Sequence, residues 1–115
     1  MAATLPKSER LCGKKAVAEL MECGKNGSAG CLRYKCLPGA EVSRILVSVP
    51  KRFFKRAVKR NLLKRRIRES YRLQKDLLPV PVDVAFFYQA REVLPFSEIY
   101  AAMTAVLTGI KERYS

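Results

Sequence analysis

The sequence predicts an α+β fold in which three helices pack on one small mixed sheet of three or four strands. Apolar residues recur at helical spacing in three segments, and short alternating or β-branched segments lie between them. The chain has 115 residues, 49% of them hydrophobic, which is enough for a modest core. We therefore expect residues 1–115 to form a single domain, with residues 1–7 disordered.

The first expected helix covers about residues 13–22 and ends before Gly24, a typical residue at a helix C-terminus. Its apolar positions at helical spacing are Ala16, Val17, Leu20 and Met21. Residues 25–30 (KNGSAG) are rich in turn formers and predict a turn or loop.

Two strands are expected next. Residues 31–37 alternate loosely, with Leu32, Tyr34 and Cys36 on one face. Residues 44–49 (RILVSV) are rich in β-branched residues and stop at Pro50. One further strand is possible on this pattern.

The second half contains a long helix, a strand and a final helix. The long helix covers about residues 55–74, and Pro79 closes the region. Residues 82–88 (VDVAFFY) predict a strand with Val84, Phe86 and Tyr88 on one face. The last helix has Ser97 as its candidate N-cap and an apolar stripe of Ile99, Met103, Val106, Leu107 and Ile110. Because a long helix joins two strands, part of the sheet is expected to be parallel.

Positive charge is concentrated in one segment. The chain has 23 Lys and Arg against 10 Asp and Glu, a net charge of +13 at pH 7, which favours binding to a polyanion. Residues 51–72 (KRFFKRAVKRNLLKRRIRESYR) hold eleven of these cations and one acid. As a helix, the segment sets an apolar stripe (Leu63, Ile67 and Tyr71) beside a ribbon of cations (Arg60, Lys64, Arg68 and Arg72). Packing would hold the stripe, and phosphates would relieve the repulsion along the ribbon.

Three polyanions compete for this segment. An anionic membrane would need a broad apolar side, but the stripe is narrow and is required by the fold. Asn61 and Arg65 resemble part of a leucine-zipper basic region that enters DNA, but no heptads follow them. We therefore expect RNA as the partner, and neither DNA nor a membrane. For Asn61, contact with a base or a 2′-hydroxyl competes with a simple surface hydrogen bond.

Other classes of function are disfavoured. The chain has no histidine, so the commonest general base and mixed Cys/His zinc sites are excluded. The cysteines Cys12, Cys23, Cys31 and Cys36 lack C-x-x-C spacing and are expected to be reduced. We find no phosphate-binding glycine loop, no nucleophile motif, no secretory signal and no membrane span, and we expect a cytoplasmic protein.

Residues 56–72 (RAVKRNLLKRRIRESYR) resemble the signature of the bacterial ribonuclease P protein component. The matching positions are Ala57-Val58, Arg60-Asn61, Lys64-Arg65 and Arg68-Glu69. The resemblance extends over most of the chain, from Arg10-Leu11 to the Phe96-Ser97-Glu98 start of the last helix. The chain departs from the family at Leu62, where an arginine is usual, and Arg66 lies one turn further on as a partial substitute. Pro50 replaces a usual serine, and Val17 and Met21 stand where the family often has aromatic residues.

The resemblance implies a protein subunit of an endoribonuclease whose catalytic subunit is RNA. That enzyme removes the 5′ leader of precursor tRNA, using Mg²⁺ bound mainly by the RNA. No catalytic residue, metal or cofactor is expected in the protein. The family fold also implies a left-handed crossover between parallel strands, against the general right-handed rule.

The implied site residues fall into two sets. Contacts to RNA are expected from Lys51, Arg52, Arg56, Lys59, Arg60, Asn61, Lys64, Arg65 and Arg68. A cleft for the leader, between the first helix and the sheet, is expected to use Val17, Met21, Tyr34, Phe86 and Tyr88. The alternative for the cleft set is burial in the core. A structural RNA-binding protein of ribosomal type is the alternative function, and a stand-alone nuclease is disfavoured by the missing histidine.

Overall fold

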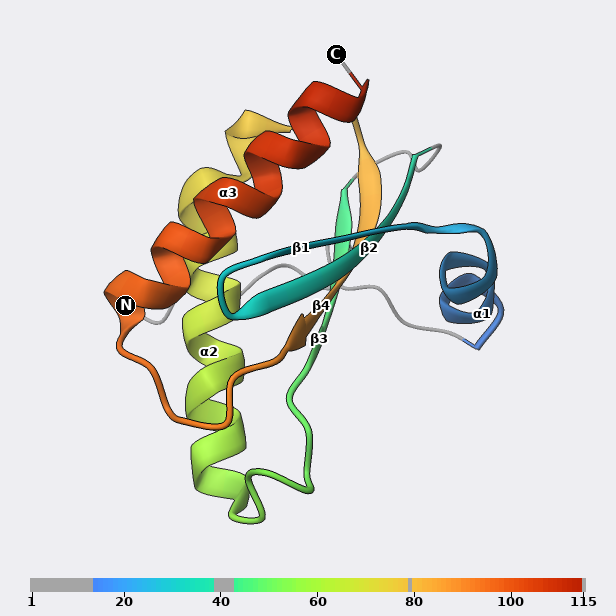
Figure 1. Ribbon diagram of the computed structural model, residues 1–115. Helices are drawn as coiled ribbons and strands as arrows, with labels where there is room; N and C mark the ends of the chain where they lie inside the picture. The colour runs from blue at the N-terminus through green and yellow to red at the C-terminus, as the bar shows by residue number, and fades with distance from the viewer. Residues whose placement is uncertain (1–13, 39–42, 79, 115) are drawn as a thin grey trace.

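The computed structural model describes residues 14–38, 43–78 and 80–114 (Figure 1). Its elements are α1 (Lys14–Cys23), β1 (Lys25–Ala29), β2 (Leu32–Pro38), β3 (Arg44–Ser48), α2 (Ala57–Gln74), the short 3-10 helix η2 (Lys75–Leu77), β4 (Val82–Tyr88) and α3 (Phe96–Tyr114). The three predicted helices and three predicted strands are therefore confirmed. The predictions for residues 1–7, Arg10-Leu11 and Cys12 lie outside the described residues.

The four strands form one mixed sheet in the order β1-β2-β4-β3. β2 is antiparallel to both of its neighbours, whereas β3 and β4 are parallel. The parallel pair is joined through α2, as the position of the long helix predicted. At the start of this pair, the Arg44 guanidinium donates two hydrogen bonds to the Asp83 carboxylate, at 2.9 and 2.8 Å.

The prediction of a loop at residues 25–30 was wrong. Residues 25–29 form β1, an edge strand paired with β2 from Lys25 opposite Cys36 to Ala29 opposite Leu32. A tight turn follows, in which Gly30 has φ of +55°, a conformation that favours glycine. The segment has no alternating apolar pattern, so its strand conformation comes from the backbone ladder with β2.

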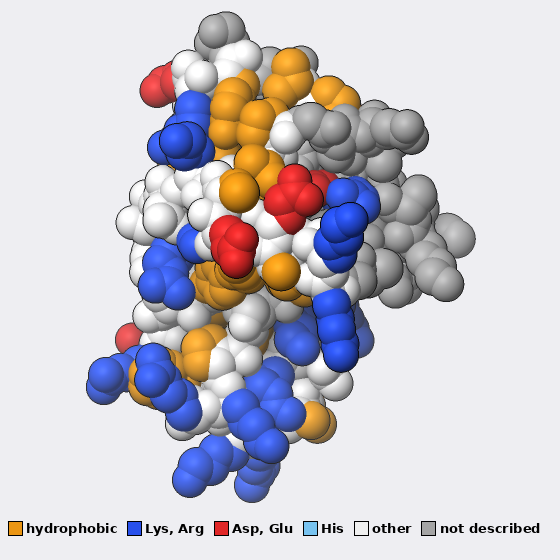
Figure 2. All heavy atoms as spheres, turned by 90° about the vertical axis from the view of Figure 1, so that its right-hand side faces the viewer, with side chains coloured by type: hydrophobic (Ala, Val, Ile, Leu, Met, Phe, Trp, Pro, Cys, Tyr) orange, Lys and Arg blue, Asp and Glu red, His pale blue; other side chains and the backbone are white. Residues whose placement is uncertain are grey.

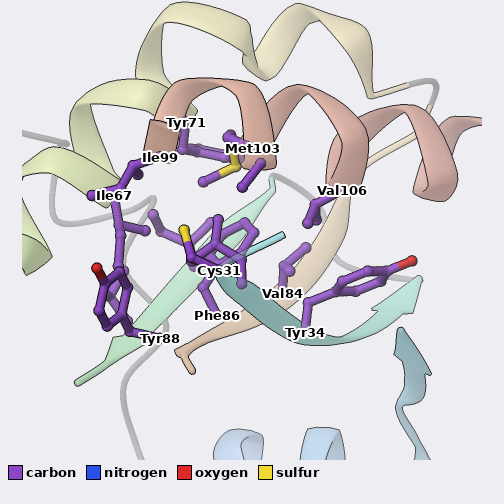
Figure 3. Close-up of a cluster of buried hydrophobic side chains, with 14 of the residues drawn as sticks. Cys31, Tyr34, Ile67, Tyr71, Val84, Phe86, Tyr88, Ile99, Met103 and Val106 are labelled. Carbon is purple, nitrogen blue, oxygen red and sulfur yellow. The ribbon is translucent and has the colours of Figure 1, made fainter. Parts of the chain in front are cut away.

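Helices cover the two faces of the sheet unequally. In Figure 1, α2 and α3 lie together on one side of the sheet, and α1 lies apart on the other. Figure 3 shows the core between the sheet and the helix pair, where Val84, Phe86 and Tyr34 from the strands meet side chains of α2 and α3. The predicted helical stripes are confirmed, since Leu63, Ile67 and Tyr71 of α2 are fully buried, as are Ile99, Met103, Val106, Leu107 and Ile110 of α3.

α1 packs on the opposite face through a smaller cluster. Leu20 and Ala85 are fully buried there. The Lys35 ammonium donates a hydrogen bond of 2.5 Å to the Met21 carbonyl, which ties β2 to the last turn of the helix. Within the described ranges, no helix is long and apolar enough to cross a membrane.

Candidate nucleic-acid interface

The loop before α2 is fixed to the fold at Phe54. That side chain is buried and makes an edge contact with Tyr88, with ring centroids 5.8 Å apart. Arg60, one turn into the helix, donates hydrogen bonds to the carbonyl oxygens of Phe54 (2.7 Å) and Lys55 (2.9 Å). Arg60 therefore holds the loop against the helix.

Most of the cations predicted to contact RNA lie at this end of α2 and are exposed. Exposed members of the predicted set are Lys51, Arg52, Arg56, Lys59, Asn61 and Arg65, and Lys64 and Arg68 are half-buried. The sequence prediction left out Lys55, which is also exposed here. Figure 2, which faces the α1 side, shows blue side chains gathered at the lower end, where Figure 1 places the start of α2. We use the name basic surface for the exposed cations and Lys64, that is, for Lys51, Arg52, Lys55, Arg56, Lys59, Lys64 and Arg65.

In the second half of α2, two arginines make contacts within the protein. Near its end, Arg72 pairs with the Glu69 carboxylate at 2.6 Å. Arg66, considered as a substitute for the missing arginine at Leu62, donates a 2.5 Å hydrogen bond to the Leu94 carbonyl and so holds the loop before α3. The most accessible cations are thus concentrated in the loop and the first half of α2.

The structure separates the five residues predicted to form a leader cleft. Val17 and Met21 are half-buried in α1 and face the sheet. Tyr34, Phe86 and Tyr88 lie on the other face, buried beneath α2 and α3. Placing these three aromatic residues in one cleft with α1 was therefore wrong, because alternate strand residues point to opposite faces.

The strand residues that face α1 alternate with those that face the main core. Leu37, Leu46 and Phe87 are half-buried and pack with Val17 and Met21 around Leu20. Beside them, the Arg33 guanidinium lies 5.2 Å from the centre of the Phe87 ring, in a cation–π contact. The sequence of β2 contained a signal that Tyr34 faces the core and not α1. Apolar and basic residues alternate there (Leu32, Arg33, Tyr34, Lys35), which places Tyr34 on the apolar face.

A hollow of about 340 Å³ opens at the end of the sheet beside Phe87. It is lined by Arg33, Ser48, Pro50, Arg52, Phe53, Phe87, Tyr88 and Gln89. Aromatic surface and two arginines therefore meet next to the face that carries α1.

The described cysteines are free thiols, with Cys23 exposed and Cys31 and Cys36 buried. Burial raises the pKa of the Cys31 and Cys36 thiols above the ordinary value of 9.0, so both thiols stay protonated further into the alkaline range. In the part of the chain that the structure describes, no group of three or more His, Cys, Asp or Glu residues lies close enough to hold a metal ion.

A comparison with protein families decides which RNA-binding class this arrangement represents. The model of the family described as Ribonuclease P matches residues 5–111. The chain belongs to the ribonuclease P protein family. It is thus a protein subunit of an endoribonuclease complex. The alternative function, a structural RNA-binding protein of ribosomal type, is not supported.

Related ribonuclease P proteins agree along most of the chain. The ribonuclease P protein component of Porphyromonas gingivalis is 37% identical over 92% of this chain and 85% of its own length. The protein component of Chlorobaculum tepidum is 34% identical over 85% of this chain and 76% of its own length.

Two solved structures show the same fold. The RNase P protein from Thermotoga maritima has a TM-score of 0.77 at 23% identity, covering 89% of this chain and 97% of that one. The RNase P protein of Staphylococcus aureus has a TM-score of 0.77 at 21% identity, covering 88% and 94%.

Proposed function

We propose that this ribonuclease P protein docks on the catalytic RNA through its basic surface and holds the 5′ leader of precursor tRNA along the face that carries α1. The observation that carries the proposal is that α2 has one side buried in the core and another that exposes cations. Leu63 and Ile67 are fully buried in the core, while Arg65 is exposed on the opposite side of the helix and Lys59 is exposed in its first turn. Each phosphate that such a cation neutralises releases condensed counterions, which favours binding.

The protein's part in the reaction is binding and positioning. Mg²⁺ keeps several waters and binds through phosphates with at most a few carboxylates, so the phosphates of the RNA are the expected ligands of the magnesium ions. Cleavage of the leader is assigned to the catalytic RNA and its Mg²⁺, in the cytoplasm where tRNA precursors are made.

The proposed site for the leader is the face of the sheet that carries α1. Val17, Met21 and Phe87 leave apolar surface partly exposed there, and Arg33 adds a cation beside the ring of Phe87. Aromatic rings beside arginines suit unpaired nucleotides, whose bases stack while their phosphates meet the charges.

The direct test is reconstitution. The pure protein is mixed with a bacterial ribonuclease P RNA at low Mg²⁺, precursor tRNA is added, and leader release is followed. We expect faster release than with RNA alone, because the cations of the protein offset phosphate repulsion that Mg²⁺ would otherwise screen. Equal rates with and without the protein would overturn the proposal.

A matched pair of variants tests the basic surface. Arg65→Gln removes an exposed cation, whereas Arg72→Gln removes a cation paired with Glu69. We expect Arg65→Gln to weaken binding to the catalytic RNA and to reduce the slope of log affinity against log salt by about one unit, with a smaller change for Arg72→Gln. Filter binding from low to high salt measures both. Identical slopes for Arg65→Gln and the unmodified protein would mean that Arg65 does not meet a phosphate.

A further inference from the structure

Two arginines from separate loops lie against one aromatic ring. The guanidinium carbon of Arg52 is 4.8 Å, and that of Arg91 is 4.9 Å, from the centre of the Phe53 ring. Arg52 and Phe53 precede α2, whereas Arg91 lies between β4 and α3. Arg91 is outside the basic segment, and no motif singled it out.

The fold holds the ring and leaves both arginines accessible. Phe53 is half-buried and packs against the main core, next to the buried Phe54. Arg52 and Arg91 are exposed. The ring therefore acts as a fixed support that limits where the two guanidinium planes can lie, which reduces the entropy lost when they bind.

Arg52 and Phe53 line two hollows, and Arg91 lines the second of them. One is the hollow beside Phe87 described above, which contains Arg33. The other, of about 400 Å³, is lined by Arg52, Phe53, Phe54, Lys55, Arg56, Lys59, Arg91, Glu92 and Val93. It has five cations and one acid, so its charge is strongly positive. The arginine–phenylalanine–arginine group thus connects the α1 face of the sheet with the basic surface.

We propose that Arg52, Phe53 and Arg91 form a stacking platform for an unpaired stretch of RNA, the part of the 5′ leader that passes from the α1 face to the basic surface. This inference rests on the proposed function and adds Phe53 and Arg91 to its binding residues. Bases of single-stranded RNA stack on aromatic rings and on guanidinium planes, whereas bases in a duplex are already stacked on one another. Cations in the hollows on both sides would meet the phosphates before and after the stacked base.

The test uses the enzyme reconstituted with the catalytic RNA and compares precursor tRNA with mature tRNA, which has no leader. We expect Arg91→Gln to weaken binding of the precursor by about fivefold and Phe53→Leu by about tenfold, since stacking of one base is worth about 1–3 kcal/mol. Binding of mature tRNA and of the catalytic RNA should change less than twofold. Lys111→Gln is the control, because it removes one exposed cation from the last turn of α3.

Three results would overturn the platform. One is an Arg91→Gln enzyme that binds precursor as the unmodified enzyme does. The second is an equal loss for precursor and mature tRNA, and the third is a loss confined to the catalytic RNA, which would assign the platform to subunit docking. In each case the unmodified protein would still stimulate leader release, so failure of the platform is distinguishable from failure of the proposed function. Circular dichroism of Phe53→Leu checks that the variant is folded, and Arg91→Gln alters an exposed side chain only.

Discussion

On one face of the sheet, α2 and α3 bury Phe86 completely, whereas on the other face α1 leaves its neighbour Phe87 half-exposed. The two rings are consecutive in β4, and strand alternation sends them to opposite sides. The face with two helices supplies most of the burial that stabilises the fold. The face with one short helix keeps apolar and aromatic surface next to cations, where a ligand can reach it.

The largest effect is expected from Phe86→Ala, on the closed face. Removing a fully buried ring leaves a cavity and should lower the free energy of unfolding by about 3–5 kcal/mol. Urea denaturation measures the change, with Phe87→Ala as the matched variant, expected to lose much less. Similar losses for the two variants would contradict the difference between the faces.

Gly27→Ala tests the edge of the same closed face. A Cβ atom on Gly27 would overlap the ring of Tyr34, which has little room to move because it is buried. We expect a loss of about 1–3 kcal/mol in the free energy of unfolding. Ser28→Ala, at the next and exposed position of β1, is the control, and its loss should stay within about 0.5 kcal/mol.

Phe87→Ala tests the open face through function. In the reconstituted enzyme, it should weaken binding of leader-bearing tRNA by about tenfold, the loss of one stacking contact, with mature tRNA bound as before. Tyr100→Ala removes a partly exposed ring from α3 and should leave both affinities unchanged. If Phe87→Ala left the binding of precursor tRNA intact, the open face would not be the leader site.

The smallest effect is a loss of stability at alkaline pH that originates in the closed face. Burial raises the pKa of the Cys36 thiol in the folded protein above its ordinary value of 9.0, so the unfolded chain loses this proton first. Stability from this group is present below pH 9 and falls as the pH rises through the folded-state pKa. Urea midpoints at pH 8 and pH 10 measure the fall, which Cys36→Ala should reduce and Cys23→Ser, at an exposed position, should not.

The elements with strong apolar periodicity were predictable from the sequence. The stripes of α2 and α3 repeat every three or four residues, and the structure buries those residues. β1 was not predictable in this way, since KNGSA has polar or small residues throughout and becomes a strand by pairing with β2. Its partner begins only three residues later, after the turn at Gly30, but no apolar pattern in β1 marks the pairing.

The basic surface was predictable because charge is visible in the sequence, whereas the sequence of β4 alone does not show which of its sides faces α1. β4 (VDVAFFY) is apolar at almost every position, so alternation groups Val84 with Phe86 but does not say which group meets two helices. That choice depends on how α1 and α3 are distributed over the sheet. The platform at Phe53 was hidden for a similar reason, because Arg91 reaches it from a loop that is distant in sequence.

The place of β4 between β2 and β3 also sets the order of events during synthesis. A ribosome releases β1, β2, β3 and the whole of α2 before Val82–Tyr88, the strand that joins β2 to β3. Until that strand emerges, the nascent chain has a hairpin, a lone strand and a cationic helix whose apolar stripe has no completed sheet to cover. Folding of the RNA-binding side therefore waits for the last third of the chain, and a product that terminates before β4 is expected to be a charged, unfolded peptide.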